Sequence, residues 1–223
     1  MVRAGAGLVL FDMDGTLLDS AAGISDSLTC AIRQLGHDFV PGPAMHELFG
    51  PPMQRIVATL LAPYADSRVD ACVAFYRAHY REQGLYNCRP YPGIDAALGA
   101  LLEQGFVLHV ATSKRQEFAE RMLSHTGLAR YFTSIQGTTA DGALDDKMTL
   151  VETLLARVAS GAAVGCLVGD KRDDMRAATA NGLVAVGALW GYGANGELSD
   201  NGADVLVESP SELPRIIQAL AAG

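Results

Sequence analysis

The hydrophobic residues of this chain change their spacing along its length, and the spacing predicts which segments form strands and which form helices. Short apolar runs predict strands over 8–11, 107–111, 134–137, 165–168, 184–187 and 205–207. Amphipathic stretches predict intervening and final helices over 94–104, 116–126, 148–158, 172–181 and 211–221. Strands that alternate with helices favour right-handed crossovers, so we expect an α/β fold: a doubly wound parallel sheet covered by helices on both faces.

The region between the first strand and the second strong strand has a helical pattern instead. Ser20 is placed to cap a helix that runs to Leu35. Further helices are predicted near 44–49, 53–62 and 69–82. We therefore expect a core made of residues 1–18 and 89–223, with a small all-helical domain inserted at 19–88.

Two acids directly follow the first predicted strand. Asp12 and Asp14 stand in the sequence Asp-Met-Asp-Gly-Thr, immediately behind the apolar run 8–11. A buried carboxylate is costly unless it is paired or bound to a metal. In open α/β sheets, ligands bind at the carboxyl ends of the strands. The pattern indicates a catalytic site at this end of the sheet.

Three later segments would bring polar groups to the same edge. The strand 107–111 is followed by Thr112, Ser113 and Lys114, and a helix is preceded by Asp145, Asp146 and Lys147. The strand 165–168 is followed by Gly169, Asp170 and, four residues later, Asp174. If the sheet is parallel, these ends converge on one crevice. Asp173 and Lys171, in the same stretch, are expected to face solvent.

These residues resemble the motifs of the haloacid dehalogenase (HAD) superfamily of phosphohydrolases, over essentially the whole chain. The D-x-D-G-T motif stands at 12–16, and the Ser/Thr that closes a strand is matched by Thr112. The lysine ahead of a helix is matched by Lys147, and G-D-x-x-x-D is matched at 169–174. The helical region 19–88 is similar to the small helical cap of that family.

The resemblance implies roles for individual residues. Asp12 would attack phosphorus to form an aspartyl-phosphate, and Asp14 would act as general acid and then base. Mg²⁺ would be held by Asp12, the main-chain carbonyl of Asp14 and Asp170. Either Asp174 or, as a rival, Asp173 would orient the waters of the metal. The residues Thr112, Ser113 and Lys147 would hold the phosphate oxygens.

Within the superfamily, the closest resemblance is to phosphoglycolate-phosphatase-like enzymes and to bacterial 5′-nucleotidases. The stretches at 49–52, 111–114, 141–147 and 189–193 are more similar to the nucleotidases, so a nucleoside 5′-monophosphate is the expected substrate. Phosphoglycolate or another small phosphorylated metabolite is the alternative, and a sugar-phosphate mutase is a remote one. Arg55 could contact the substrate or be an ordinary surface arginine. Phe49 or Tyr64 could stack on a base, although aromatic residues on such helices more often belong to the core.

Two unrelated readings compete with this one. A phospho-accepting receiver domain also uses acids, Thr and Lys around Mg²⁺, but it has about half this length and no helical insertion. The stretch 191–196 matches the G-x-G-x-x-G pattern of dinucleotide-binding oxidoreductases. That pattern should open the first βα turn, whereas here it lies near the C-terminus. We expect a flexible loop beside the active site.

Composition and charge limit the partners. A net charge of −8 without a Lys/Arg-rich stripe argues against nucleic acid. No apolar run approaches the ~18 residues of a membrane helix, so no membrane partner is expected. The expected partner is a small-molecule phosphate ester, and the expected assembly is a monomer or homodimer. A cytoplasmic location follows from four cysteines too scattered for a disulfide framework, namely Cys30, Cys72, Cys88 and Cys166.

Overall fold

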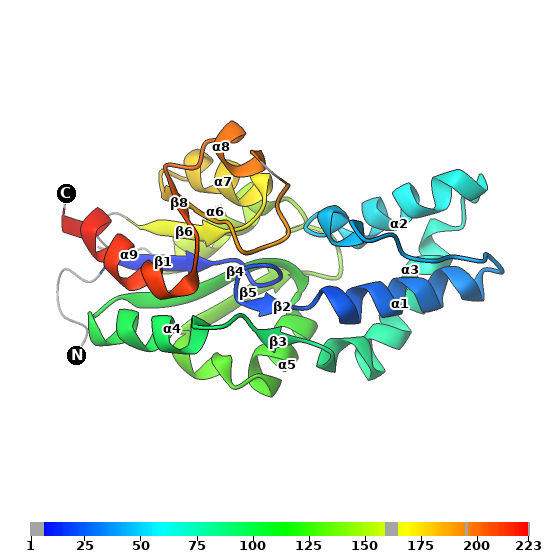
Figure 1. The fold of residues 1–223 in the computed structure, drawn as a ribbon, viewed down its shortest axis with the longest axis horizontal. Coiled ribbons are helices and arrows are strands. Elements are labelled where there is room, and N and C mark those ends of the chain that lie inside the picture. The colour runs from blue at the N-terminus through cyan, green and yellow to red at the C-terminus, as the bar shows by residue number, and fades with distance from the viewer. Residues whose placement is uncertain (1–6, 159–164, 195, 223) are drawn as a thin grey trace.

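The computed structural model describes residues 7–158, 165–194 and 196–222, and it contains an α/β core from one end of which helices project (Figure 1). Within the described residues the core sheet has six parallel strands in the order β5-β4-β1-β6-β7-β8. They are β1 (Leu8–Phe11), β4 (Val107–Arg115), β5 (Ser134–Thr138), β6 (Cys166–Gly169), β7 (Val184–Ala188) and β8 (Val205–Val207). This arrangement confirms the doubly wound parallel sheet predicted from the sequence.

The apolar run of β1 explains its central place in the sheet. All four of its residues are buried, and alternate side chains belong to different hydrophobic clusters. Val9 and Phe11 pack in one cluster, whereas Leu8 and Leu10 pack in the other. A strand buried on both faces must be apolar at every position, because successive side chains point to opposite sides of the sheet.

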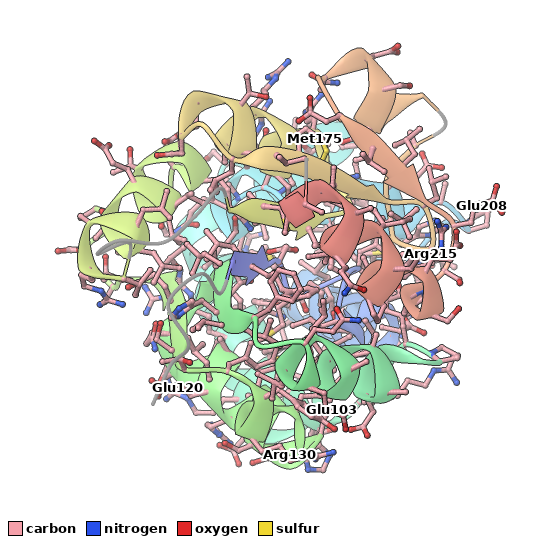
Figure 2. The ribbon with its side chains drawn as sticks, turned by 90° about the vertical axis from the view of Figure 1, so that its left-hand side faces the viewer. Glu103, Glu120, Arg130, Met175, Glu208 and Arg215 are labelled. Carbon is pink, nitrogen blue, oxygen red and sulfur yellow. The ribbon has the colours of Figure 1, made fainter. Side chains whose placement is uncertain are left out.

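Helices cover both faces of the sheet. One layer holds α4 (Ile94–Glu103), α5 (Gln116–His125) and α9 (Leu213–Ala222), whose buried side chains join the cluster of Val9 and Phe11. The other holds α6 (Lys147–Val158), α7 (Arg172–Ala180) and α8 (Glu197–Asp200). The charged side chains labelled in Figure 2, such as Glu103 and Arg215, point outward from the end of the core far from the projecting helices.

Most predicted elements lie within a residue or two of those observed, and β4 is the main exception. It continues to Arg115 instead of ending at residue 111, with a register shift against β5 between Ala111 and Arg115. Thr112, Ser113 and Lys114 therefore belong to the strand itself. Short 3-10 segments precede β5 and α9, namely η4 (Leu128–Tyr131) and η5 (Pro210–Glu212).

The projecting helices lie between two short antiparallel strands, β2 (Leu18–Asp19) and β3 (Arg89–Pro90). We call residues 20–88 the helical insertion. Its elements are α1 (Ala21–Gln34), η1 (Met45–Leu48), α2 (Met53–Leu61), η2 (Ala62–Tyr64), α3 (Val69–Glu82) and η3 (Gly84–Tyr86). The predicted domain boundaries at 18/19 and 88/89 fall on or next to this ribbon, and the division into two domains stays a prediction. None of the helices in the described ranges combines the length and the hydropathy needed to span a bilayer.

Candidate active site

The polar residues predicted to form a site meet where the central strands end. Asp12 and Asp14 follow β1, and Asp170 follows β6. The strands β1 and β6 are parallel neighbours, and the Asp12 amide donates to the carbonyl of Val168 at 2.8 Å. The structure therefore brings together six of the residues predicted from the sequence: Asp12, Asp14, Thr112, Lys147, Asp170 and Asp174.

Three buried carboxylates form what we call the acid cluster: Asp12, Asp170 and Asp174. One oxygen from each lies within 4.8 Å of the others. Burial raises the pKa of Asp12 to about 7, although Lys147 opposes this effect. Burial, followed by the charge of Asp12, also raises the pKa of Asp170 well above its usual range. Such shifts mark a site where negative charge is confined at a cost.

One buried lysine faces this cluster. The Nζ atom of Lys147 lies 2.5 Å from Oδ1 of Asp12 and 2.9 Å from Oδ1 of Asp174. Burial lowers the pKa of Lys147, but the two carboxylates outweigh burial and raise it. Within the described ranges, Asp170 has no ion-pair partner. One cation against three carboxylates leaves an excess of oxygen ligands, which is the donor set that a hard divalent cation prefers.

The glycine-containing stretch at 191–194 lies beside the acid cluster, as expected, and supports Asp170. The Tyr192 amide donates to Oδ2 of Asp170 at 2.8 Å, and the Thr16 hydroxyl donates to Oδ1 at 2.9 Å. A Cβ on Gly191 would overlap the side chain of Asp170, so only glycine allows this approach. Asn195 lies outside the described residues.

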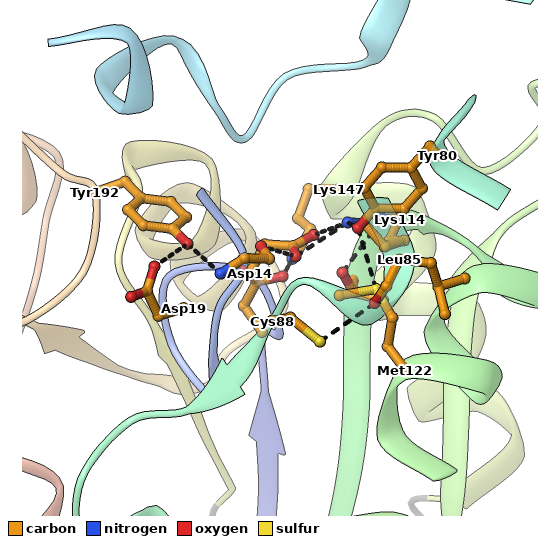
Figure 3. A network of polar contacts seen from close by, with 12 residues as sticks. Asp14, Asp19, Tyr80, Leu85, Cys88, Lys114, Met122, Lys147 and Tyr192 are labelled. Carbon is orange, nitrogen blue, oxygen red and sulfur yellow. Dashed lines mark hydrogen bonds and ion pairs between the residues drawn. The ribbon is translucent and has the colours of Figure 1, made fainter. Parts of the chain in front are cut away.

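Asp14 is held by its own set of polar partners, which include Ser20 and Lys114 (Figure 3). Its carboxylate accepts hydrogen bonds from the Ser20 hydroxyl at 2.5 Å and from Lys114 Nζ at 3.0 Å. Ser20 stands at the start of α1 as predicted, but its side chain makes no cap hydrogen bond to the helix. Its hydroxyl is used by Asp14 instead, and this corrects the capping role expected from the sequence.

Thr112 and Ser113 line the cavity above the acid cluster. The Thr112 side chain is buried, and its hydroxyl accepts a hydrogen bond from the Lys114 amide at 3.2 Å. Because β4 continues past residue 111, this hydroxyl belongs to the irregular part of the strand, between Ala111 and Arg115, rather than to a loop.

Lys171 was expected to face solvent, but the structure places it in the interior. It is buried, and its Nζ donates to the Glu47 carbonyl in the helical insertion at 3.0 Å and contacts Glu197 Oε2 at 3.3 Å. Asp174 accepts a hydrogen bond from the Lys171 amide at 3.0 Å. Asp173 is only half-buried and lines the cavity, so Asp174 rather than Asp173 belongs to the acid cluster.

A cavity of about 300 Å³ separates the acid cluster from the helical insertion. The insertion contributes Phe49, Tyr76 and Arg77 to its wall, and the core contributes Phe118 and Arg115. This wall combines aromatic surface with two guanidinium groups. A ligand bound at the acid cluster would contact this wall with the part of the ligand that extends away from the cluster.

Two of the residues considered for substrate binding lie elsewhere. Arg55 is exposed on α2 and is not among the residues that line this cavity, although Gln54 and Ile56 are. Tyr64 stacks on His37 with ring centroids 4.2 Å apart, also away from the cavity. Phe49 does line the cavity, where it also packs edge-on against Tyr192.

Comparison with known proteins identifies the family. The sequence profile described as haloacid dehalogenase-like hydrolase matches residues 9–188, which include the acid cluster, Lys147 and the whole helical insertion. The chain belongs to the haloacid dehalogenase-like hydrolases. The resemblance inferred from the sequence motifs is thereby confirmed.

Several relatives of this HAD-like hydrolase are named for the hydrolysis of phosphate esters, while others at 32% identity are named tyrosine-protein kinase. It is 34% identical over 190 residues to a 5′-nucleotidase of Pseudomonas aeruginosa, covering 85% of this chain and 86% of the relative. It is 32% identical to a phosphoglycolate phosphatase of Neisseria meningitidis, covering 87% and 85%. The crystal structure of a predicted phosphatase from Clostridium acetobutylicum is similar with a TM-score of 0.86 and 30% identity, covering 96% and 99%. The chain is thus a HAD-family phosphatase, a phosphoric monoester hydrolase.

Sequence reasoning missed two features of this HAD phosphatase site. Lys114 was expected at this edge of the sheet, but its pairing with Asp14 was not predicted, and Arg77 on α3, which lines the cavity, was not among the expected site residues. The pairing of Lys114 joins residues 100 positions apart, which no local pattern reveals. For Arg77, the only available signal was its place next to the apolar face of an inserted helix.

Proposed function

We propose that this protein hydrolyses phosphomonoesters with Mg²⁺ and an aspartyl-phosphate intermediate, and that its substrate is a nucleoside 5′-monophosphate. The observation that carries the mechanism is the position of Asp12. It lines the cavity, contacts Lys147 at 2.5 Å and shares the acid cluster with two further carboxylates. A nucleophile, a cation and a metal-ligand set are therefore in contact with one another.

Asp12, the main-chain carbonyl of Asp14 and Asp170 would hold the Mg²⁺ ion. Asp174 would orient water around it, because its two oxygens are already engaged by Lys147 and by the Lys171 amide. When bound, the ion supplies positive charge that offsets the repulsion between the phosphate and the carboxylates.

The first half-reaction forms the phospho-enzyme. An oxygen of Asp12 attacks phosphorus, the bond from phosphorus to the ester oxygen breaks, and Asp14 gives its proton to that leaving oxygen. Thr112, Ser113 and Lys147 hold the phosphate oxygens during the transfer, since all three line the cavity next to Asp12. General acid catalysis of this kind contributes about 10²–10⁴ in rate.

The second half-reaction releases phosphate. Asp14, now a carboxylate, takes a proton from water, and the water oxygen attacks the phosphorus of the aspartyl-phosphate. The bond from phosphorus to Asp12 breaks, and inorganic phosphate leaves. Both residues return to their starting protonation states, so the cycle is complete.

Two observations favour a nucleotide substrate. The relative of Pseudomonas aeruginosa named 5′-nucleotidase is 34% identical. The cavity wall offers aromatic surface from Phe49, Tyr76 and Phe118 together with the guanidinium of Arg77, which suits a base and a polar sugar. The phosphoglycolate phosphatase of Neisseria meningitidis, at 32% identity, makes phosphoglycolate the alternative.

We also propose that the protein acts in the cytoplasm on free small molecules, as a monomer or homodimer. Two of its four cysteines, Cys72 and Cys166, are buried as free thiols, and burial raises the pKa of Cys72 to about 11. Because these thiols are protonated and buried and form no disulfide, the fold does not depend on an oxidising compartment. Light scattering coupled to gel filtration would give the oligomeric state.

The test is a phosphate-release panel with Mg²⁺, containing nucleoside 5′-monophosphates, 2-phosphoglycolate and sugar phosphates. We expect the highest kcat/KM on a nucleoside 5′-monophosphate and no activity for Asp12→Asn. Equal or better turnover of 2-phosphoglycolate would overturn the proposed substrate class. An active Asp12→Asn variant would overturn the assignment of Asp12 as nucleophile.

A further inference from the structure

Lys114 connects the proposed acid–base residue to a fixed part of the protein. Its Nζ lies 2.9 Å and 3.0 Å from the two carboxylate oxygens of Asp14, and 2.7 Å from the hydroxyl of Tyr80 (Figure 3). The Lys114 side chain is only 8% exposed and that of Asp14 only 16%. This pair is therefore largely removed from water, unlike the ordinary surface ion pairs that contribute little.

Tyr80 is held rigidly from several sides. It is fully buried, stacked on Tyr76 with centroids 5.2 Å apart and edge-on to Phe118 at 5.4 Å. The Tyr80 ring thus packs between α3 and α5, and the neighbouring Arg81 also contacts Glu117 of α5 at 2.9 Å. The Tyr80 hydroxyl therefore has a defined position relative to the core.

The Tyr80 hydroxyl donates one hydrogen bond and accepts another. It donates to Sδ of Met122 at 3.2 Å, so its oxygen is left to accept from Lys114. The ammonium also lies 4.6 Å from the centroid of the Tyr80 ring. The chain of contacts runs from Met122 through Tyr80 and Lys114 to the Asp14 carboxylate.

We propose that Lys114 is a positioning residue that fixes the carboxylate of Asp14 for proton transfer, and that Tyr80 fixes Lys114. This inference rests on the proposed function, in which Asp14 protonates the leaving oxygen. Proton transfer requires the carboxyl group within hydrogen-bond reach of that oxygen, and a displacement of about 1 Å can cost about 10² in rate. Without the ammonium, the Ser20 hydroxyl alone would hold the carboxylate.

The alternative role for Lys114 is direct phosphate binding, because it also lines the cavity. Leaving groups separate the two roles. An alkoxide must be protonated as it departs, whereas p-nitrophenolate departs without a proton. Loss of a positioned acid therefore slows phospho-enzyme formation, which kcat/KM reports, selectively for alkyl phosphates, but loss of a phosphate ligand slows it for alkyl and aryl phosphates together. The second half-reaction, in which Asp14 acts as base, is common to both substrates and affects kcat alike.

The experiment compares kcat/KM, which reports phospho-enzyme formation, for the alkyl phosphate that the enzyme hydrolyses fastest and for p-nitrophenyl phosphate. The variants are Lys114→Met and Tyr80→Phe, with Asp14→Asn as reference. Lys171→Met is the matched control, because it removes a buried lysine between core and insertion that contacts Glu47 and not Asp14. Melting temperatures accompany every variant.

For Lys114→Met we expect kcat/KM on the alkyl phosphate to fall at least about tenfold more than kcat/KM on p-nitrophenyl phosphate. Tyr80→Phe should show the same selectivity to a smaller degree, about threefold, since the ring and its contacts remain. Lys171→Met should lower kcat/KM on both substrates by a similar factor.

Equal losses on both substrates for Lys114→Met and Tyr80→Phe, beside a selective loss for Asp14→Asn, would overturn the role of Lys114 alone. Equal losses for Asp14→Asn would instead overturn the proposed acid–base role, and the inference about Lys114 would fall with it. If Lys114→Met does not fold, Tyr80→Phe decides the question, because it removes only the hydroxyl.

Discussion

The ammonium of Lys147 lies 2.5 Å from the carboxylate of Asp12, and both side chains are buried at the base of the cavity. The same ammonium contacts Asp174 at 2.9 Å. A buried ion pair is stable only when both partners are present, because either one alone is an uncompensated charge. Lys147 therefore has two consequences that can be measured separately, one for stability and one for catalysis.

Lys147→Met should lower activity by about 10²–10³ or more, because a charged group that holds the phosphate oxygens is lost. In EDTA it should also lose about 3–5 kcal/mol of unfolding free energy at pH 8, since Asp12 and Asp174 would remain buried without a cation. At pH 5.5 the loss should be smaller, because burial raises the pKa of Asp12 and lets it take up a proton. Urea denaturation at both pH values measures this, and a variant as stable as the wild type at pH 8 would contradict it.

The metal-free protein should lose stability between about pH 4 and 7. Burial raises the pKa of Asp12 to about 7, above its value in the unfolded chain. A raised pKa contributes stability that is present at low pH and is lost as pH rises through the folded-state value. Magnesium, which favours the ionised carboxylates, should then stabilise the protein more as pH increases.

Melting curves in EDTA and in Mg²⁺ from pH 5.5 to 8.5 test this. A change of 1 kcal/mol in unfolding free energy shifts Tm by roughly 2–4 °C in a protein of this size. Asp12→Asn is the control, because it removes one of the two carboxylates with a raised pKa and should weaken the pH dependence of the Mg²⁺ effect. A Mg²⁺ shift that stays constant with pH in the wild type would show that Asp12 does not titrate in this range.

Gly191→Ala should weaken metal binding. The new Cβ would overlap the Asp170 side chain and the Gly15 carbonyl, so Asp170 must move. We expect the Mg²⁺ concentration for half-maximal activity to rise at least about tenfold, which corresponds to 1.4 kcal/mol of lost binding. Gly42→Ala is the matched control, because no heavy atom lies within 4 Å of its Cβ position and its φ is not left-handed. If both variants bind Mg²⁺ alike, the segment around Gly191 does not support the metal site.

The sequence alone predicted the sheet and the acid cluster because both depend on local patterns. An apolar run such as that at Leu8–Phe11 marks a buried central strand, and motif residues at strand ends converge once the strands are parallel. The roles of Ser20 and Lys171 could not be predicted in this way. Each depends on a partner in another element: Ser20 bonds to Asp14, and Lys171 bonds to Glu47.

The length of β4 and the packing of the 191–196 stretch were missed for a similar reason. Polar residues such as Thr112 and Lys114 end an apolar run in sequence, but pairing with β5 continues to Arg115. The glycines near Gly191 resemble a flexible loop until the contact with Asp170 is seen. In both cases a tertiary contact overrides the local preference of the sequence.

Two arginines of the helical insertion give a matched test of where the substrate lies. Arg77 on α3 is half-buried, lines the cavity and forms no ion pair within the described ranges. Burial, and then the nearby Arg115, lowers its pKa, although Asp145, which also lines the cavity, opposes the shift. A guanidinium in this position is suited to an anionic or polar part of the substrate. Arg55 on α2 is exposed and is not among the cavity-lining residues.

Arg77→Ala should therefore raise KM for the preferred substrate by about tenfold with little change in kcat, because the lost contact is made equally in the ground and transition states. Arg55→Ala should leave both parameters near the wild-type values. Phosphate-release kinetics over a range of substrate concentrations measure both. A larger effect for Arg55 than for Arg77 would place the substrate outside this cavity, and unchanged kinetics for both would remove the guanidinium groups from substrate recognition.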